Sequence, residues 1–80
     1  MISSPRAVID IGSNAIRLVV YGGPPRAPMP IYNEKARIAL GESVARTGGI
    51  EPGLIEAAVA ALRRFDGLTQ AMQVEQRRVV

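Results

Sequence analysis

The stretch that decides the fold is residues 7–20, which read AVIDIGSNAIRLVV. It contains two runs rich in β-branched residues, separated by four small or polar residues that begin at Gly12. Such runs favour strands, and both Gly12 and Asn14 tolerate the positive φ of a tight turn. The stretch therefore predicts a β-hairpin with strands at about residues 6–11 and 15–22.

The rest of the chain predicts another strand, a long helix and the start of a last strand. After a loop of glycine and proline we expect a strand at about residues 29–40, interrupted near residues 33–35. Residues 41–49 predict a loop with at most one short helical turn, ended by a glycine pair. From Pro52 onward apolar residues recur every three or four positions, so a helix is expected at about residues 52–71. Its apolar stripe comprises Leu54, Ile55, Ala58, Val59, Leu62, Phe65 and Leu68.

These elements place residues 1–80 in the α/β class as one unit. A last strand starting at about residues 76–80 gives the order β-β-β-α-β. That order predicts a mixed sheet, antiparallel at first and parallel after the helical crossover. The first strand is apolar on both sides until Asp10, which predicts a central strand covered on both faces. A chain of 80 residues buries only ~60% of its unfolded surface, so we expect marginal stability when it is alone.

The composition excludes several kinds of site. The sequence has no cysteine and no histidine, which excludes disulfides, thiolate zinc sites and imidazole bases. The net charge is +3 and nine of the ten basic residues are arginine, which suits anionic ligands. The basic residues are scattered, so a nucleic-acid patch is not expected. No apolar run is long enough for a signal peptide or a membrane span, and a cytoplasmic protein without membrane contact is expected.

The turn of the hairpin carries the candidate chemistry. Asp10 ends a buried strand, and Gly12, Ser13 and Asn14 follow in a turn whose backbone N–H groups can surround a phosphate. Asp10 could hold a hydrated divalent cation. The residues also fit an ordinary hairpin turn in which the aspartate bonds nearby backbone. They match neither the Walker nor the Rossmann pattern, so local chemistry leaves both readings open.

A longer resemblance favours the phosphate-binding interpretation. Residues 7–20, together with Asn-Glu-Lys at 33–35, Leu-Gly-Glu at 40–42, Thr-Gly-Gly-Ile at 47–50 and Ala-Leu-Arg-Arg-Phe at 61–65, resemble the exopolyphosphatase and guanosine pentaphosphate phosphatase (Ppx/GppA) family in order and spacing. The resemblance covers nearly the whole chain. It implies the amino-terminal part of an actin-like ATPase (ribonuclease H-like) domain. Ser43 departs from the family, where many relatives carry a second glycine, and so does the pair Asp66-Gly67.

The resemblance also implies a function and a partial site. The intact enzyme would release terminal phosphate from inorganic polyphosphate or guanosine pentaphosphate, with magnesium. The resemblance assigns phosphate binding to Gly12, Ser13 and Asn14, and a metal contact to Asp10. No catalytic residue is expected within the chain, because the family's glutamate lies beyond Val80. Residues 1–80 would be an incomplete first domain, inactive when alone.

Other assignments stay open at this point. Arg17, Lys35 and Arg37 could contact a polyanion, or could lie in solvent as strand residues often do. The same superfamily includes nucleotide-binding or regulatory modules without hydrolysis, and sugar or acyl-phosphate kinases. A homodimer of the intact protein is equally open.

Overall fold

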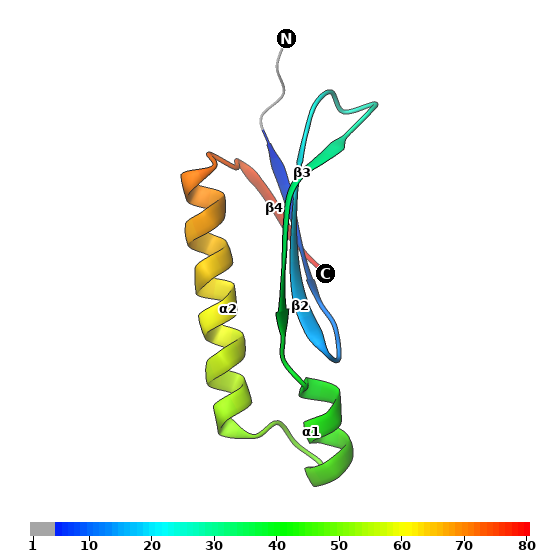
Figure 1. The fold of residues 1–80 in the computed structure, drawn as a ribbon, viewed down its shortest axis with the longest axis vertical. Coiled ribbons are helices and arrows are strands. Elements are labelled where there is room, and N and C mark those ends of the chain that lie inside the picture. The colour runs from blue at the N-terminus through cyan, green and yellow to red at the C-terminus, as the bar shows by residue number, and fades with distance from the viewer. Residues whose placement is uncertain (1–4) are drawn as a thin grey trace.

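The hairpin forms the start of the fold in the computed structural model, which describes residues 5–80 (Figure 1). Strands β1 (Arg6–Ile11) and β2 (Ala15–Gly22) pair antiparallel, with Arg6 opposite Tyr21 at one end and Ile11 opposite Ile16 at the other. The N–H of Gly12 donates to the carbonyl oxygen of Ala15 at 2.9 Å and closes the turn. The predicted hairpin is confirmed.

Two further strands complete a mixed sheet in the order β3-β2-β1-β4. Strand β3 (Met29–Arg37) pairs antiparallel with β2, and β4 (Gln76–Val79) pairs parallel with β1. The parallel pair is joined through the helical part of the chain, as a parallel connection requires. The predicted α/β class and mixed sheet are therefore correct, and β1 is an inner strand.

Strand β3 differs from its prediction at two points. It ends at Arg37 rather than near residue 40, because β2 begins at Ala15, opposite Arg37, and offers no further partner. The next amide, that of Ile38, donates instead to the carbonyl oxygen of Asn14 at 2.9 Å. Pairing continues without a break through residues 33–35, and the irregularity lies earlier, opposite the Val20 to Tyr21 step.

A helix, α1 (Leu40–Thr47), occupies the region predicted as a loop with at most one helical turn. It ends at Gly48, whose φ of 80° is left-handed and whose N–H donates to the Val44 carbonyl oxygen at 2.8 Å. The predicted role of the glycine pair as a helix stop is thus correct. The buried Ser43 hydroxyl contacts the Gly49 carbonyl and the Glu51 amide, and so ties α1 to the following helix.

The long helix α2 (Pro52–Ala71) covers one face of the sheet (Figure 1). Its Ala61, Phe65 and Thr69 are buried, and they lie four residues apart on one side of the helix. Ala61 and Phe65 make the hydrophobic core together with Ile38 and the α2-facing residues of β1 and β2. Although α2 has 20 residues, no helix in the described part of the chain combines the length and apolar character needed to cross a bilayer.

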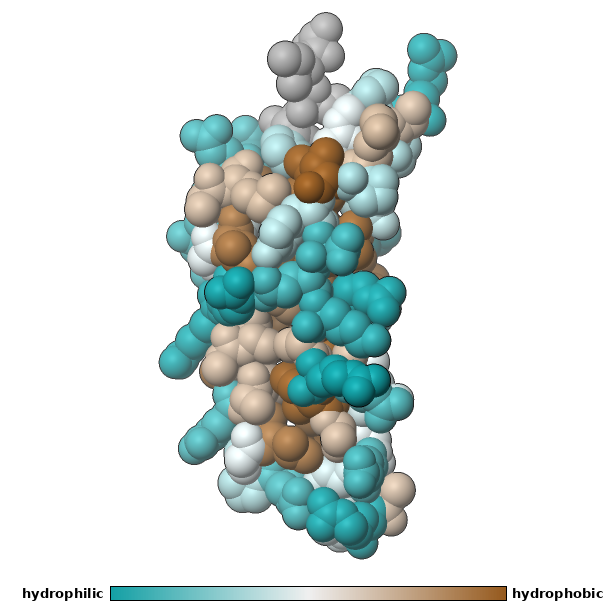
Figure 2. All heavy atoms as spheres, in the orientation of Figure 1, coloured by the Kyte–Doolittle hydropathy of each residue, from teal (hydrophilic) through white to brown (hydrophobic). Residues whose placement is uncertain are grey.

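The predicted apolar stripe of α2 is too wide. Leu54, Ala58, Leu62 and Leu68 do pack on the core, but Ile55 and Val59 are exposed. The narrow four-stranded sheet offers contact to only one side of the helix. Figure 2, which looks along the seam between α2 and the sheet, shows apolar surface there broken by hydrophilic side chains.

The prediction that β1 is covered on both faces is also wrong for residues 5–80. Ala7 and Ile9 are buried under α2, whereas Val8 is only half-buried and Asp10 is exposed. No helix of the described chain covers the face that carries Val8 (Figure 1). We call this the open face of the sheet.

Candidate phosphate-binding turn

The turn between β1 and β2 lies at the end of the sheet next to α1 (Figure 1). Residues 10–14 are all exposed, so a ligand could reach the turn from solvent. Neither Gly12 nor Asn14 has a positive φ, so the expectation that the turn uses their tolerance of positive φ is wrong. At position 12 glycine is favoured by limited space instead, because a Cβ there would lie 3.3 Å from the Ala15 carbonyl oxygen.

The hydrogen bonds of the turn use its carbonyl groups and leave donors free. The carbonyl oxygen of Ser13 accepts from the Gly41 amide at 2.6 Å, and that of Asn14 accepts from the Ile38 amide at 2.9 Å. Within residues 5–80 no acceptor meets the backbone N–H of Ser13 or of Asn14. Their side chains also have no hydrogen bond there. Two successive free amides beside a hydroxyl and a carboxamide form a donor set suited to an anion.

Helix α1 contacts the turn through Gly41, the middle residue of the Leu-Gly-Glu stretch at 40–42, for which the sequence indicated no role. A Cβ at position 41 would lie 2.9 Å from the Ser13 Cβ, closer than two such atoms approach. Only glycine lets the helix come this near. The turn is therefore supported from behind by its carbonyl bonds to residues 38 and 41.

A hollow of about 310 Å³ lies beside the turn, between Asn14 and the start of α1. Arg37 lines it together with Ile38, Ala39 and Glu42. Arg37 is opposite Ala15 in the sheet, which explains why the end of β3 reaches the turn. Of the three cations predicted to contact a polyanion, Arg37 is the one beside Asn14, and Glu42 is a rim residue that the sequence analysis missed.

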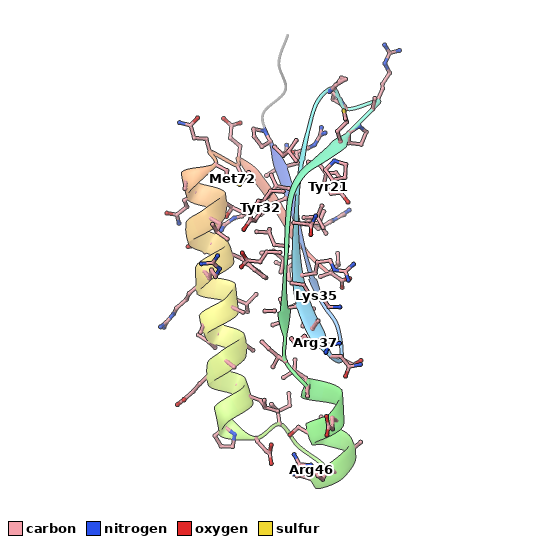
Figure 3. All side chains as sticks on the ribbon, viewed as in Figure 1. Tyr21, Tyr32, Lys35, Arg37, Arg46 and Met72 are labelled. Atoms are coloured by element: carbon pink, nitrogen blue, oxygen red, sulfur yellow. The ribbon has the colours of Figure 1, made fainter. Side chains whose placement is uncertain are left out.

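Arg17 and Lys35 lie farther up the open face. Asp10 is opposite Arg17, and Arg17 is opposite Lys35, so the three form a row across β1, β2 and β3. Figure 3 shows Lys35 and Arg37 on the side of the sheet away from α2. Asp10 makes no ion pair with any residue in the range 5–80. Its carboxylate is therefore available to a ligand or cation.

The residues around the turn fit a magnesium ion only in part. No group of three or more acidic, histidine or cysteine side chains gathers anywhere in residues 5–80. Mg²⁺, however, is commonly held by one or two carboxylates, with waters and substrate phosphates as the other ligands. Asp10 fits that mode as a single protein ligand beside a phosphate.

The known proteins that this chain resembles are solved structures. No family model and no curated protein matches the sequence. The Aquifex aeolicus Ppx/GppA phosphatase, in its type II crystal structure, matches with a TM-score of 0.88 and 26% identity, over 96% of this chain and 26% of that one. A second structure of the Aquifex aeolicus family member gives 0.87 and 27%, over 94% and 24%. An exopolyphosphatase from Cytophaga hutchinsonii shares the fold, with a TM-score of 0.82 and 24% identity over 94% and 24%.

Proposed function

Because the chain has the fold of the Ppx/GppA phosphatases over nearly its whole length, we propose that it supplies the first phosphate-binding turn of a phosphoanhydride hydrolase. The substrate is inorganic polyphosphate or guanosine pentaphosphate, which both end in an anhydride-linked phosphate. The chain spans about a quarter of the length of the structures that it matches. The water-activating glutamate and the opposing phosphate loop of this proposal therefore come from outside residues 1–80, and the chain alone is inactive.

The observation that carries the proposal is the pair of free amides at Ser13 and Asn14. Phosphate oxygens accept charge-assisted hydrogen bonds from backbone N–H groups, and these are stronger than neutral ones. The carbonyls of the same two residues bond to Gly41 and Ile38, which fixes the turn before a ligand arrives. Donors that need no rearrangement stabilise charge that develops on a transferred phosphoryl group.

Arg37 and Asp10 complete this half of the site on opposite sides of the turn. Arg37 lines the hollow next to Asn14, where its guanidinium can pair with a second phosphate oxygen. Asp10 binds the magnesium ion, directly or through water. When bound, the ion neutralises phosphate charge and orients the terminal group.

A binding experiment on the chain itself tests the turn. Tripolyphosphate with Mg²⁺ is titrated into the isotope-labelled chain, and the amide signals of Ser13 and Asn14 are followed by NMR. We expect saturable shifts centred on these two amides, weakened about tenfold or more by Asp10→Ala. Glu56→Ala, an exposed change on α2, is the charge-matched control and should leave the affinity unchanged. If the two variants weaken binding equally, the turn is not the site.

Hydrolysis is tested by placing the chain in the corresponding quarter of the Aquifex aeolicus phosphatase. Phosphate release from polyphosphate and from guanosine pentaphosphate is measured separately, which identifies the preferred substrate. Asp10→Ala should reduce the rate by ~100-fold or more with an unchanged melting temperature, the size seen when a charge-stabilising group is removed. Phosphoryl transfer to an added acceptor would favour a kinase, and binding without release would favour a regulatory module.

A further inference from the structure

A hollow of about 460 Å³ lies at the opposite end of the sheet from the phosphate-binding turn. Its walls include Arg6 at the start of β1, Tyr21 near the end of β2 and Arg78 in β4. Pro25 and Pro28, from the loop between β2 and β3, also line it. Figure 3 shows Tyr21 on the side of the sheet away from α2, so the hollow belongs to the open face.

The distance to the turn makes this hollow a separate site. Strand β1 has six residues, with Arg6 first, and the turn follows its last residue. At ~3.3 Å per residue the two ends of the strand are ~17 Å apart. A single small phosphate could not contact both places.

Two arginines of this hollow lack a charge partner. Val8 is opposite Arg78 and Arg6 is opposite Gln76, so Arg6 and Arg78 lie two residues apart along neighbouring strands, both on the open face. Their Cα atoms are thus ~8 Å apart. Within residues 5–80 neither guanidinium forms an ion pair. Arg77, which points to the other face, is by contrast paired with Asp66 of α2.

Arg6 also has a buried donor without an acceptor. Its Nη2 atom is shut off from solvent and makes no hydrogen bond in the described part of the chain. Buried guanidinium N–H groups nearly always form hydrogen bonds. A buried donor without an acceptor has lost its hydrating water and gains nothing in return, which costs free energy. The guanidinium of Arg6, a residue of the wall of the hollow, therefore has hydrogen-bonding capacity that the described residues do not use.

The other walls are mostly apolar, with Gln76 and the ion-paired Arg77 as the remaining polar residues. Val8, the ring of Tyr21 and the two prolines surround the arginines. The volume is within the range of small-molecule sites, which combine apolar walls with a few polar groups that fix orientation. Flat rings pack against tyrosine, and a guanidinium fork matches phosphate or carboxylate. We propose that the hollow binds a small anion joined to a flat ring, of the type of a nucleoside monophosphate, independently of the phosphate-binding turn.

The test uses adenosine monophosphate as the probe and the isotope-labelled chain as the target. We expect saturable NMR shifts at Arg6, Val8 and Tyr21, with none at Ser13 or Asn14. Benzoate, with a ring and a carboxylate, should compete for the same signals. Inorganic phosphate should bind at least about tenfold more weakly than the nucleotide, because it leaves the apolar walls empty.

Variants separate this site from general attraction to a basic chain. Arg78→Gln alters an exposed side chain and should weaken the nucleotide at least about tenfold. Arg6→Gln should do the same. Arg63→Gln, an exposed arginine of α2, removes the same charge and should have no effect. Equal loss in all three variants, equal affinity for inorganic phosphate, or no saturable binding at millimolar nucleotide would each overturn the proposal.

Discussion

The two faces of the sheet use the same strands for different purposes. On the face under α2, Leu18 and Val20 are 0% exposed and pack with the equally buried Phe65. On the open face, the alternate residues Arg17, Val19 and Tyr21 are exposed or half-buried. Since successive side chains of a strand point to opposite faces, one sequence can place its packing on one side and its charges on the other. In this chain the core is one-sided, and both candidate sites lie outside it.

The largest effect should follow from Phe65→Ala. Phe65 is fully buried in the core between α2 and the sheet, and removing a buried phenylalanine ring costs ~3–5 kcal/mol. In a small domain this is a large part of the total stability. Urea unfolding followed by circular dichroism would measure it, and we expect the variant to be largely unfolded at room temperature.

The matched change on the open face is Val19→Ala. Val19 is only half-buried and no helix of the described chain packs over it, so the loss should be below ~1 kcal/mol. A loss as large as that of Phe65→Ala would show that the open face is part of the core.

The next effect concerns the contact between α1 and the turn. Gly41→Ala would bring a Cβ to 2.9 Å from the Ser13 Cβ, and forcing the two apart should cost ~1–3 kcal/mol. The NMR signals of Ser13 and Asn14 should move, because the bond from the Gly41 amide to the Ser13 carbonyl is disturbed and Asn14 is the next residue of the turn. Gly67→Ala is the control within α2, where a Cβ meets nothing within 4 Å. It should stabilise the chain by ~0.5–1 kcal/mol and leave the turn signals in place.

Elements built from local pattern could be predicted from the sequence. The β1–β2 hairpin and α2 follow from β-branched runs and from helical periodicity, and both are where the sequence predicts them. Helix α1 was missed because its start has Gly41 and no side-chain cap at Ala39. Its first turn is held by a tertiary contact with Ser13. The end of β3 was missed for a related reason, since the start of β2 decides it.

The position of the candidate turn could be predicted from the sequence, but the hydrogen bonds that shape it could not. The hairpin turn lies where the sequence predicts it, and Arg37 among the polyanion candidates lies beside it. Which amides are free depends on how Ile38 and Gly41 bond to the carbonyls of Ser13 and Asn14. Those contacts join residues far apart in the chain, so no local pattern indicates them. The roles of these residues in binding stay predictions.

The smallest effect should come from the hydrogen-bonded cluster of Arg64, Glu34 and Tyr32, which joins α2 to β3. Arg64 of α2 donates to both carboxylate oxygens of Glu34 in β3, at 2.5 and 2.9 Å, and the Tyr32 hydroxyl donates to the same group at 2.7 Å. The Arg64 hydrogen bonds, followed by that of Tyr32, lower the pKa of Glu34 from 4.5 to about 2. A carboxyl whose pKa is lowered on folding stabilises the fold above its unfolded pKa and loses this contribution as the pH falls.

The stabilisation from Glu34 should therefore be complete above pH 4.5 and disappear as the pH falls towards about 2. The difference in urea midpoint between the wild-type chain and Glu34→Gln measures it, and should shrink over that window. The difference should stay modest at neutral pH, because Arg64 is 61% exposed and solvent screens the pair. Arg64→Gln should remove the larger part of this pH dependence, and the double variant should add only the smaller part that comes from the Tyr32 hydroxyl. A midpoint difference that persists unchanged at pH 2 would mean that Glu34 acts through packing, and that charge plays no part in joining the helix to the sheet.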